Sequence, residues 1–474
     1  MGLFHKYGPD KGYVILGHAT FLAYLVFTLI YFKERLLNCD AAYYTFHVIN
    51  YEDFFVKHQR YISYFTQWAP LLVIKMGGSL KAALIAYSGI FGVWFYGMYL
   101  VSVHVWKNPK GGIYLALSLF LAMRYKHFAG HTEITFAIAV AAMLVIWITS
   151  NKSNLAWYTD KVDWGIKGIF IGWLYIIHPI IIVPLAIVLT VDILYHQKWK
   201  DRGHLVFLVI LIASFVVRFL SVASDSYESG KISILTTARD VFSNPGDYYV
   251  FTMLGRYITN EYIPILIIFF AIMYWMISKK KFLSSTFLML GFFALSGLII
   301  VTYSYLRGDI FIMIDGYLGM LGMVWGFAVY LFLRTENSKT WIVFTLSILM
   351  AYSIFRVWEK KYILERRLEQ YQITMSMYPD NPKLFAHLHL HDWDQFWYPY
   401  EISMETLMLS SIQGPEYSRT IFVDYDDKGH TDYIEGNDYF LNFYNKTDIQ
   451  NLNKKFFRLS SDQPYFNIDR VSWK

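Results

Sequence analysis

The sequence predicts an all-α polytopic membrane protein with a small α+β domain at its C-terminal end. Of the 474 residues, 56% are apolar and only 16% are charged, which is too little charge for an ordinary globular surface. The mean hydropathy is positive. The apolar residues also gather in runs close to the about 20 residues that a helix needs to cross the hydrocarbon core of a bilayer.

Eleven such runs are predicted to be transmembrane helices, two of them short. They lie near residues 13–32, 79–104, 112–123, 132–149, 164–177, 179–195, 205–222, 259–277, 283–305, 311–333 and 341–358. The fifth and sixth runs form one apolar stretch around His178 and Pro179, which is compatible with one kinked helix or with two short helices. We expect two helices, because a single helix would move the three lysines at 279–281 to the outer side.

The loops between the runs predict an orientation. Basic residues follow every even-numbered run, at Lys107 and Lys110, Lys152 and Lys161, Lys198, Lys200 and Arg202, Lys279 to Lys281, and Arg334 and Lys339. Because loops rich in Lys and Arg stay in the cytoplasm, we expect the N-terminus inside, the tail outside and the chain in the cytoplasmic (inner) membrane. The first run lacks a small-residue cleavage site, so it is expected to be a retained anchor.

Two domains follow from this organisation. Residues 1–358 are expected to form the transmembrane domain, and residues 359–474 an extracytoplasmic domain. The tail begins with a charged segment of helical spacing and continues with short β-branched and aromatic runs that are broken by turn residues. This pattern predicts a helix that extends the last span into water, followed by a small mixed domain.

Composition and motifs narrow the classes of function. The net charge of +6 is spread over short clusters between apolar runs, so no nucleic-acid partner is expected. Cys39 is the only cysteine, which excludes an intramolecular disulfide and a cysteine-rich metal site. The sequence has no phosphate-binding glycine motif, no Gly-x-Ser-x-Gly elbow and no His-Glu-x-x-His motif. Candidate chemistry therefore lies with the charges at the outer ends of helices, because charge near a bilayer is costly.

The first outer loop, residues 33–78, is both polar and aromatic. Tyr61, Phe65 and Trp68 recur at helical spacing. We expect an amphipathic helix in the membrane interface that buries these rings and holds His58 and Arg60 toward water or a lipid phosphate. The alternative is a helix that only anchors the fold.

Asp40 is the residue of this loop that is best suited to take part in a reaction. It follows the first run in "CDAAYY", where small alanines leave room around its carboxylate. A carboxylate that is partly removed from water can act as a general base toward an acceptor hydroxyl. The alternative is that Asp40 caps the N-terminus of the next helix.

A second group lies in "RYKHFAGHTEITF", between the third and fourth runs. It comprises Arg124, Lys126, His127, His131 and Glu133. The turn is short, so we expect it to reach the same surface as the first loop. Phosphate or divalent-cation contact and a purely structural polar turn both fit, because two spaced ligands are a weak metal signal. A third outer turn, "YLRGDIF", adds Arg307, whose pairing with Asp309 is more typical of structure.

The arrangement resembles the GT-C superfamily of integral-membrane glycosyltransferases, in particular bacterial members with uncharacterised substrates. About eleven helices, a large first outer loop that runs from Asp40 in "CDAAYY" to Arg60 in "HQRY", and a small outer domain carry the resemblance. It implies transfer of a sugar from a polyprenyl-phosphate donor to an acceptor glycan, lipid or protein on the outer face. Many members have paired acids in this loop, whereas Asp40 stands alone, which puts metal dependence in doubt.

The resemblance implies a role for each candidate residue. Asp40 would be the catalytic base, and His58, His127, His131 and Glu133 would position the substrate. The donor phosphate would be bound by Arg60, Arg124, Lys126 and Arg307. A divalent cation stays open as a cofactor. The alternative function is a non-catalytic membrane subunit that docks a protein partner through its outer tail. A transporter is less favoured, because the charges gather at outer helix ends rather than at mid-membrane.

Overall fold

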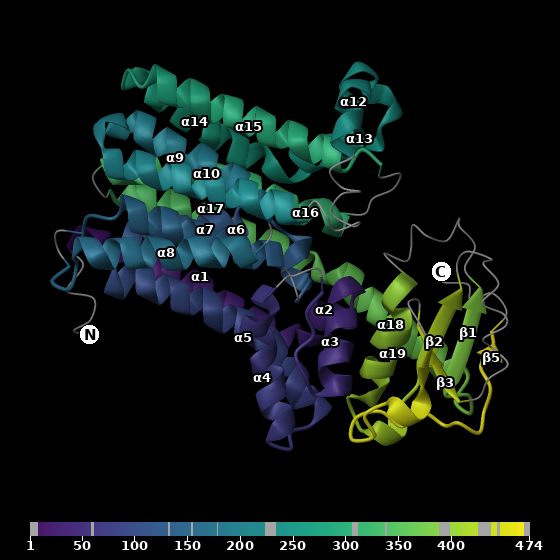
Figure 1. The fold of residues 1–474 in the computed structure, drawn as a ribbon. Helices are drawn as coiled ribbons and strands as arrows, with labels where there is room; N and C mark the ends of the chain where they lie inside the picture. Colours follow the sequence, from purple (N-terminus) through teal and green to yellow (C-terminus); the bar gives the residue numbers. More distant parts are fainter. Residues whose placement is uncertain are drawn as a thin grey trace.

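The computed structural model is dominated by a bundle of long helices, from which a smaller domain with strands projects at one end (Figure 1). It describes residues 8–57, 61–130, 133–152, 155–177, 179–222, 234–305, 311–336, 339–387, 399–424, 438–442 and 446–468. Its long apolar helices and the small sheet region near the C-terminus fit the predicted helical membrane protein.

Each of the eleven predicted runs falls on a helix of the bundle. These helices are α1 (Lys11–Ile30), α5 (Leu80–Leu100), α6 (Pro109–Phe120), α7 (Glu133–Thr149), α8 (Asp160–Ile176), α9 (Ile182–Tyr195), α10 (Arg202–Val222), α14 (Ile263–Ser278), α15 (Phe282–Thr302), α16 (Phe311–Thr335) and α17 (Thr340–Glu359). The stretch around Pro179 is split into α8 and α9, as the loop charges required.

The expected number of eleven spans is not met. Among the described residues, six helices are long and apolar enough to cross a membrane: Gly8–Ile30, Leu80–Val105, Tyr249–Ser278, Phe282–Thr302, Ile314–Thr335 and Thr340–Met377. Helices α6, α7, α8 and α9 contain 12, 17, 17 and 14 residues. At about 1.5 Å per residue they are shorter than a hydrocarbon core of about 30 Å.

The basic connections meet at one end of the bundle. In the connection after α9, Lys198 bonds the buried carboxylate of Asp192 at 3.0 Å, and Arg334 at the end of α16 reaches the same carboxylate at 2.8 Å. Glu336, which follows α16, pairs with Lys279 at the end of α14 at 3.3 Å. Three of the five basic connections are thereby tied together.

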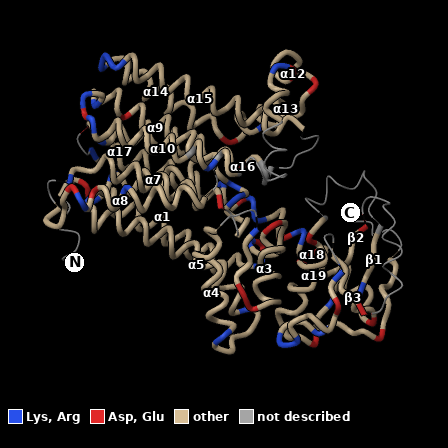
Figure 2. Tube along the Cα trace, viewed as in Figure 1, with Lys and Arg blue, Asp and Glu red and all other residues tan. Residues whose placement is uncertain are grey.

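The other two basic connections join the same end. Asn108, just before α6, donates to Ser150 Oγ after α7 at 2.9 Å and to Tyr330 Oη near the end of α16 at 3.0 Å. Figure 2 shows charged residues gathered at this end and at the opposite junction with the smaller domain, with few along the helices between them. This distribution is typical of helices that cross an apolar layer.

The first loop is largely helical. It contains α2 (Phe32–Leu36), α3 (Cys39–Tyr51), the 3-10 turn η2 (Tyr61–Ser63) and α4 (Tyr64–Lys75). In Figure 1, α3 and α4 run across the direction of the bundle helices. A helix, α4, is present where the amphipathic helix was predicted. Of the three expected rings, Phe65 packs partly into the protein and its carbonyl accepts from the Trp94 indole at 2.7 Å, whereas Tyr61 and Trp68 are exposed on the protein surface. The contact of these two rings with the membrane interface stays a prediction.

Helices at the other outer connections are short. The connection after α10 contains η8 (Ile234–Thr237), α12 (Ala238–Ser243), η9 (Pro245–Asp247) and α13 (Tyr249–Tyr257), followed by a π-helical turn, η10 (Ile258–Tyr262). A π-turn inside a helix is rare and is frequent at functional sites. The turn between α6 and α7 is η4 (Tyr125–Phe128).

The tail combines helices with a small sheet. Its elements are α18 (Lys361–Met377), β1 (Lys383–His387), α19 (Ile402–Ser411), β2 (Thr420–Asp424), β3 (Tyr439–Leu441), β4 (Lys446–Asp448) and β5 (Phe466–Asn467). The three-stranded parallel sheet has the order β2-β1-β5, and β3 pairs antiparallel with β4. Only Lys360 separates α17 from α18, so the tail continues directly from the last helix of the bundle. We call residues 361–468 the outer domain, a name that follows the orientation expected from the sequence.

Candidate functional site

The outer domain binds the first residue of α3. The backbone N–H of Cys39 donates to Glu405 Oε1 at 2.8 Å. The same carboxylate receives Arg367 Nη2 at 2.9 Å and the Tyr371 hydroxyl at 2.7 Å. Glu405 and Tyr371 are fully buried, and Arg367 is nearly so. A residue of the first loop is thus part of a buried network that joins α18 and α19.

The charge state of Glu405 follows from its partners. Burial raises the pKa of the Glu405 carboxyl, and the Arg367 guanidinium beside it opposes that rise. Its hydrogen-bond partners among the described residues are the guanidinium, the phenol and the backbone N–H, all of them donors. Four acceptor lone pairs on a carboxylate suit such a set, so the ionised form fits the site.

The outer domain also binds the last turn of α3. The Asn453 side chain donates to Glu52 Oε1 at 2.8 Å and to the Ile49 carbonyl at 3.2 Å. The Asn453 backbone N–H donates to Asn50 Oδ1 at 2.9 Å. Glu52, a charged residue of the first loop, is therefore part of this contact.

Both ends of α3 are in an unusual backbone conformation. Cys39 has φ of 46° and Glu52 has φ of 51°, and residues with a Cβ adopt such values at a cost. The outer domain forms a hydrogen bond with each of these two residues. Hydrogen bonds from the outer domain therefore stabilise two strained termini and fix the helix between them.

Asp40 lies on this fixed helix and its side chain is exposed. The N-cap position belongs to Asn38, whose side chain makes no capping bond, and Asp40 is in the first turn. The alternative that Asp40 is the N-cap is therefore wrong. A carboxylate in the first turn is stabilised by the helix dipole, and its exposure leaves it accessible to a reactant.

The first loop and the second turn meet, as expected. Asn38 Nδ2 donates to the Phe128 carbonyl at 2.8 Å, and Gly130 N–H donates to the Arg35 carbonyl at 2.7 Å. A Cβ at Gly130 would lie 2.9 Å from that carbonyl oxygen, so the close approach requires glycine. Arg35 is buried and donates to Ser88 Oγ at 2.8 Å, so it is a core residue rather than a surface charge.

Several candidates of the second turn are internal. His127 is buried, with its ring nitrogens 3.3 Å from the Tyr24 hydroxyl and 3.1 Å from the Leu119 carbonyl. Glu133 is buried in the first turn of α7. Both positions are more typical of structural residues than of groups that touch a substrate.

Arg124 belongs to a buried ionic junction centred on Glu261 of the π-helical turn. Arg124 Nε lies 3.4 Å from Glu261 Oε2, and its other nitrogens donate to backbone carbonyls of its own turn, one of them that of Phe120 at 2.7 Å. Arg356 Nη2 lies 2.9 Å and Lys360 Nζ 2.5 Å from Glu261 Oε1. Arg356, near the end of α17, is paired here with Glu261. The guanidinium of Arg124 is thus committed to internal partners.

Lys126 differs from Arg124. Its backbone N–H and that of Arg124 donate to Asp315 Oδ2 at 2.7 and 2.8 Å, which holds the turn against the start of α16. Its side chain is half-buried and extends past Gly316. Within the part of the chain that the structure describes, the Lys126 ammonium has no hydrogen-bond or ion-pair partner. It is therefore the cation of this turn that is able to meet an external anion.

Four predicted site residues lie outside the described residues: His58, Arg60, His131 and Arg307. Among the residues that are described, no group of three or more His, Cys, Asp or Glu side chains is arranged to hold a metal ion. The predictions on these four positions and on a divalent cation stay predictions.

Sequence reasoning missed the acidic residues that organise the junction. Glu261 stands in "TNEYIPIL" and Asp315 in "MIDGY", both within apolar segments. An acid in such a segment is by default a functional or structural site with a nearby partner. That signal was present, but the partners are between 95 and 191 residues away and cannot be read from spacing.

Comparisons with known proteins identify no relative. No family model, no curated protein and no solved structure matches the chain.

Proposed function

We propose that the protein is a membrane glycosyltransferase that uses a polyprenyl-phosphate sugar. The Asp40 carboxylate accepts the proton of an acceptor hydroxyl while that oxygen attacks the anomeric carbon of the donor. The bond from the anomeric carbon to the phosphate oxygen breaks, and polyprenyl phosphate leaves with the electron pair. Lys126 neutralises the charge that develops on the phosphate.

The observation that carries the proposal is that Asp40 has an exposed side chain on a helix that is fixed at both ends. Its side chain is exposed, while the helix that bears it is bound at Cys39 and at Glu52 by the outer domain. A catalytic group must be held in a fixed geometry and still reach its substrate. An acid that only supported the fold would not need such a fixed frame.

Lys126 supports the same proposal. The turn that carries it is bound to Asn38, the N-cap of α3, two residues before Asp40. An ammonium without a partner among the described residues, on a turn that is joined to the helix of Asp40, suits a lipid phosphate and an acceptor hydroxyl on the same side of the protein. Arg124 has no such freedom, so the phosphate role proposed for this turn passes to Lys126.

The membrane and the orientation are part of the proposal. We propose that the chain lies in the cytoplasmic membrane, with the end that carries the basic connections inside. The positive-inside rule supports this orientation, because that end joins Lys198, Lys279 and Arg334. Asp40 and the outer domain then face the side where polyprenyl-phosphate sugars are consumed by enzymes that the sequence resembles.

The test is sugar transfer by the full chain in lipid nanodiscs, with synthetic polyprenyl-phosphate hexoses and pentoses as donors. Asp40→Asn should abolish transfer without changing helical content. Asp53→Asn is the matched control, because Asp53 is an exposed acid of the same loop. Lys126→Gln should lower kcat more than it raises the KM for the donor, because the charge that Lys126 neutralises develops as the phosphate leaves. Full activity of Asp40→Asn would refute the assignment.

A second candidate is a non-catalytic subunit with the same scaffold. The burial of Arg124, His127 and Glu133 favours it, because three of the predicted substrate contacts are internal. In that case neither Asp40→Asn nor Lys126→Gln changes the function of the complex, and a protein partner copurifies in a fixed ratio. Loss of transfer in Asp40→Asn with no partner present would exclude this candidate.

A further inference from the structure

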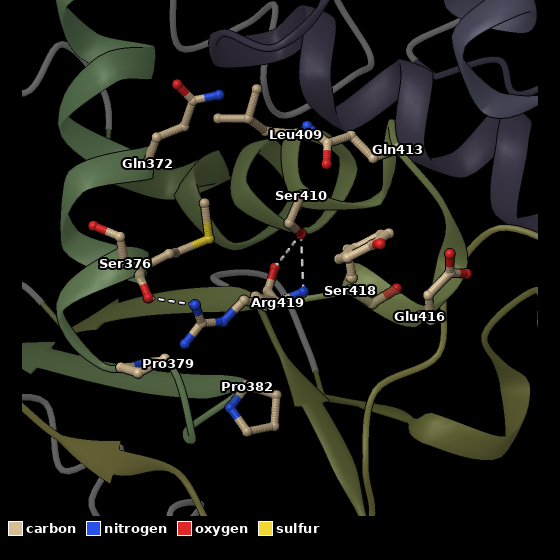
Figure 3. Close-up of a pocket in the computed structure, with 12 residues that line it drawn as sticks. Gln372, Ser376, Pro379, Pro382, Leu409, Ser410, Gln413, Glu416, Ser418 and Arg419 are labelled. Carbon is tan, nitrogen blue, oxygen red and sulfur yellow. Dashed lines mark hydrogen bonds between the residues drawn. The ribbon is translucent and has the colours of Figure 1, made fainter.

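The outer domain contains a pocket that the proposed chemistry does not use. It has a volume of about 560 Å³ and lies between α18, α19 and the connection that leads to β2. Figure 3 shows Gln372 and Ser376 on one side and Gln413 and Glu416 on the other, with Arg419 between them. Pockets for small ligands commonly have volumes of about 300–1,000 Å³.

The polar side chains of the rim are available to a ligand. Gln372, Gln413 and Glu416 are exposed, and none of the three side chains makes a hydrogen bond to another described residue. An amide both donates and accepts, and a carboxylate accepts. The rim thus presents donors and acceptors at short range without a concentration of charge.

The one cation among the lining residues is already occupied. The Arg419 guanidinium donates to the carbonyls of Met375, Tyr378 and Asn381, the last at 3.0 Å. It thereby satisfies carbonyl groups at the C-terminal end of α18. The Nε of Arg419 makes no hydrogen bond to a described residue, but it is buried. A phosphate or another anion would therefore find no exposed N–H of a cation here and would meet the carboxylate of Glu416, so anionic ligands are disfavoured.

An aromatic ring and a partly apolar floor complete the pocket. Tyr417 is 53% exposed, which is high for a tyrosine on a small folded domain. Met375 and Leu409 are buried at the base. A flat ring next to amides and a carboxylate matches a ligand that has apolar C–H faces and many hydroxyl groups. A neutral sugar has both, because each hydroxyl donates and accepts and its ring carbons pack on aromatic faces.

We propose that this pocket binds a neutral oligosaccharide, as an acceptor-binding site of the outer domain. The assignment to the acceptor rests on the proposed function, whereas the binding of a neutral sugar does not. The position supports the assignment. Gln372 lies next to Tyr371, and Leu409 is one turn after Glu405, so the pocket shares two helices with the network that holds Cys39. A glycan bound here is kept close to the helix that carries Asp40.

The experiment measures binding by the full chain in lipid nanodiscs. Sugar-based detergents are avoided, because their headgroups would compete. The probes are mannotriose, galactotriose and chitotriose as neutral trisaccharides and trigalacturonate as the anionic one, and saturation-transfer NMR reports contact. We expect at least one neutral trisaccharide to bind and trigalacturonate not to bind.

Variants locate the site. Tyr417→Ala and Gln413→Ala should each weaken binding by about tenfold. Tyr362→Ala is the matched control, because Tyr362 is a tyrosine of the same domain that is 55% exposed, lies at the start of α18 and is not a lining residue. The proposal is overturned if no neutral trisaccharide binds, if trigalacturonate binds best, or if Tyr417→Ala and the control behave alike. Capture of a peptide that competes with no sugar would also overturn it.

The two proposals fail separately. Asp40→Asn should bind the trisaccharide as the unsubstituted chain does, because Asp40 is not a lining residue. Sugar transfer that persists in Tyr417→Ala with unchanged acceptor KM would refute the pocket as an acceptor site and leave the transferase proposal intact. Binding of a trisaccharide without any sugar transfer would refute the transferase proposal and, with it, the assignment of the pocket to the acceptor. It would leave intact the proposal that the pocket binds a neutral sugar.

Discussion

The backbone N–H of Cys39 lies 2.8 Å from Glu405 Oε1, across 366 residues of sequence. This bond links the residue before Asp40 to a carboxylate in the core of the outer domain. The position of Asp40 therefore depends on the docking of that domain, and substitutions on either side of the contact can test this dependence.

Glu405→Gln should loosen the N-terminal end of α3. Glutamine keeps the size but removes the charge that balances buried Arg367, and breaking a buried pair in this way costs about 3–5 kcal/mol. Cys39 is a built-in probe, because burial raises the pKa of its thiol and so slows its reaction with maleimide. We expect Cys39 to be labelled several times faster in Glu405→Gln. Glu416→Gln, an exposed acid of the same domain, should leave the rate unchanged; equal rates in all three proteins would contradict the coupling.

Asn453→Ala should loosen the other end of α3. The substitution removes two side-chain hydrogen bonds, to Glu52 and to the Ile49 carbonyl, and keeps the backbone bond to Asn50. We expect faster hydrogen exchange in the last turn of α3, with a loss of about 1–2 kcal/mol of protection. Asn451→Ala is the control, because Asn451 contacts Asn50 through its backbone carbonyl. Unchanged exchange in Asn453→Ala would show that the bundle alone fixes this turn.

Glu261→Gln should destabilise the bundle. It removes the one carboxylate that Arg124, Arg356 and Lys360 share, so it leaves buried positive charge without compensation. The expected loss is about 3–5 kcal/mol of unfolding free energy, seen as a lower Tm. Glu359→Gln is the matched control.

Glu359 pairs with the same Arg356, but its side chain is 39% exposed, so little change is expected there. Similar Tm values for Glu261→Gln and Glu359→Gln would mean that the buried junction contributes no more than a surface pair.

Lys383 should make the stability of the outer domain depend on pH. Burial lowers the pKa of Lys383 to about 8, with Asp438 and Asp462 opposing the shift. The unfolded chain, with an ordinary lysine pKa of about 10.4, then binds more protons than the folded chain between about pH 8 and 10.4. The free energy of unfolding should therefore rise with pH across this window, by at most about 3 kcal/mol.

The measurement is urea unfolding of the full chain between pH 7 and 10.5, followed by circular dichroism. Lys383→Met keeps the length of the buried side chain and removes its titration, so the rise should be absent. A slope that survives in Lys383→Met would assign the pH dependence to other groups.

Most of the helices of the bundle could be predicted from the sequence, because apolar runs and basic connections are recognised from residues that are close together in the chain. The split at Pro179 and the meeting of the first loop with the 124–130 turn followed from loop charge and loop length. The spans were overcounted, since a run of apolar residues does not reveal where a helix ends: α6 stops at Phe120 after 12 residues.

The contacts of the candidate site were harder to predict, because the residues that pair there are distant in sequence. Arg124 and Lys126 have the same charge and stand two residues apart, yet Arg124 is fully buried, whereas the Lys126 ammonium has no partner among the residues that the structure describes. Glu52 and Glu405 are indistinguishable from solvated acids until the outer domain is in place. Only the tertiary contacts separate structural charges from available ones.

The single residue between α17 and α18 fixes how far α18 is rotated about its axis relative to α17. Each added residue turns an α-helix by about 100° and advances it by about 1.5 Å. One residue inserted at Lys360 would therefore turn α18 by more than a quarter of a revolution, and would carry Arg367 and Tyr371 away from the face that Glu405 occupies. The number of residues in the last helix of the bundle therefore determines which face of α18 points toward Glu405 and the first loop.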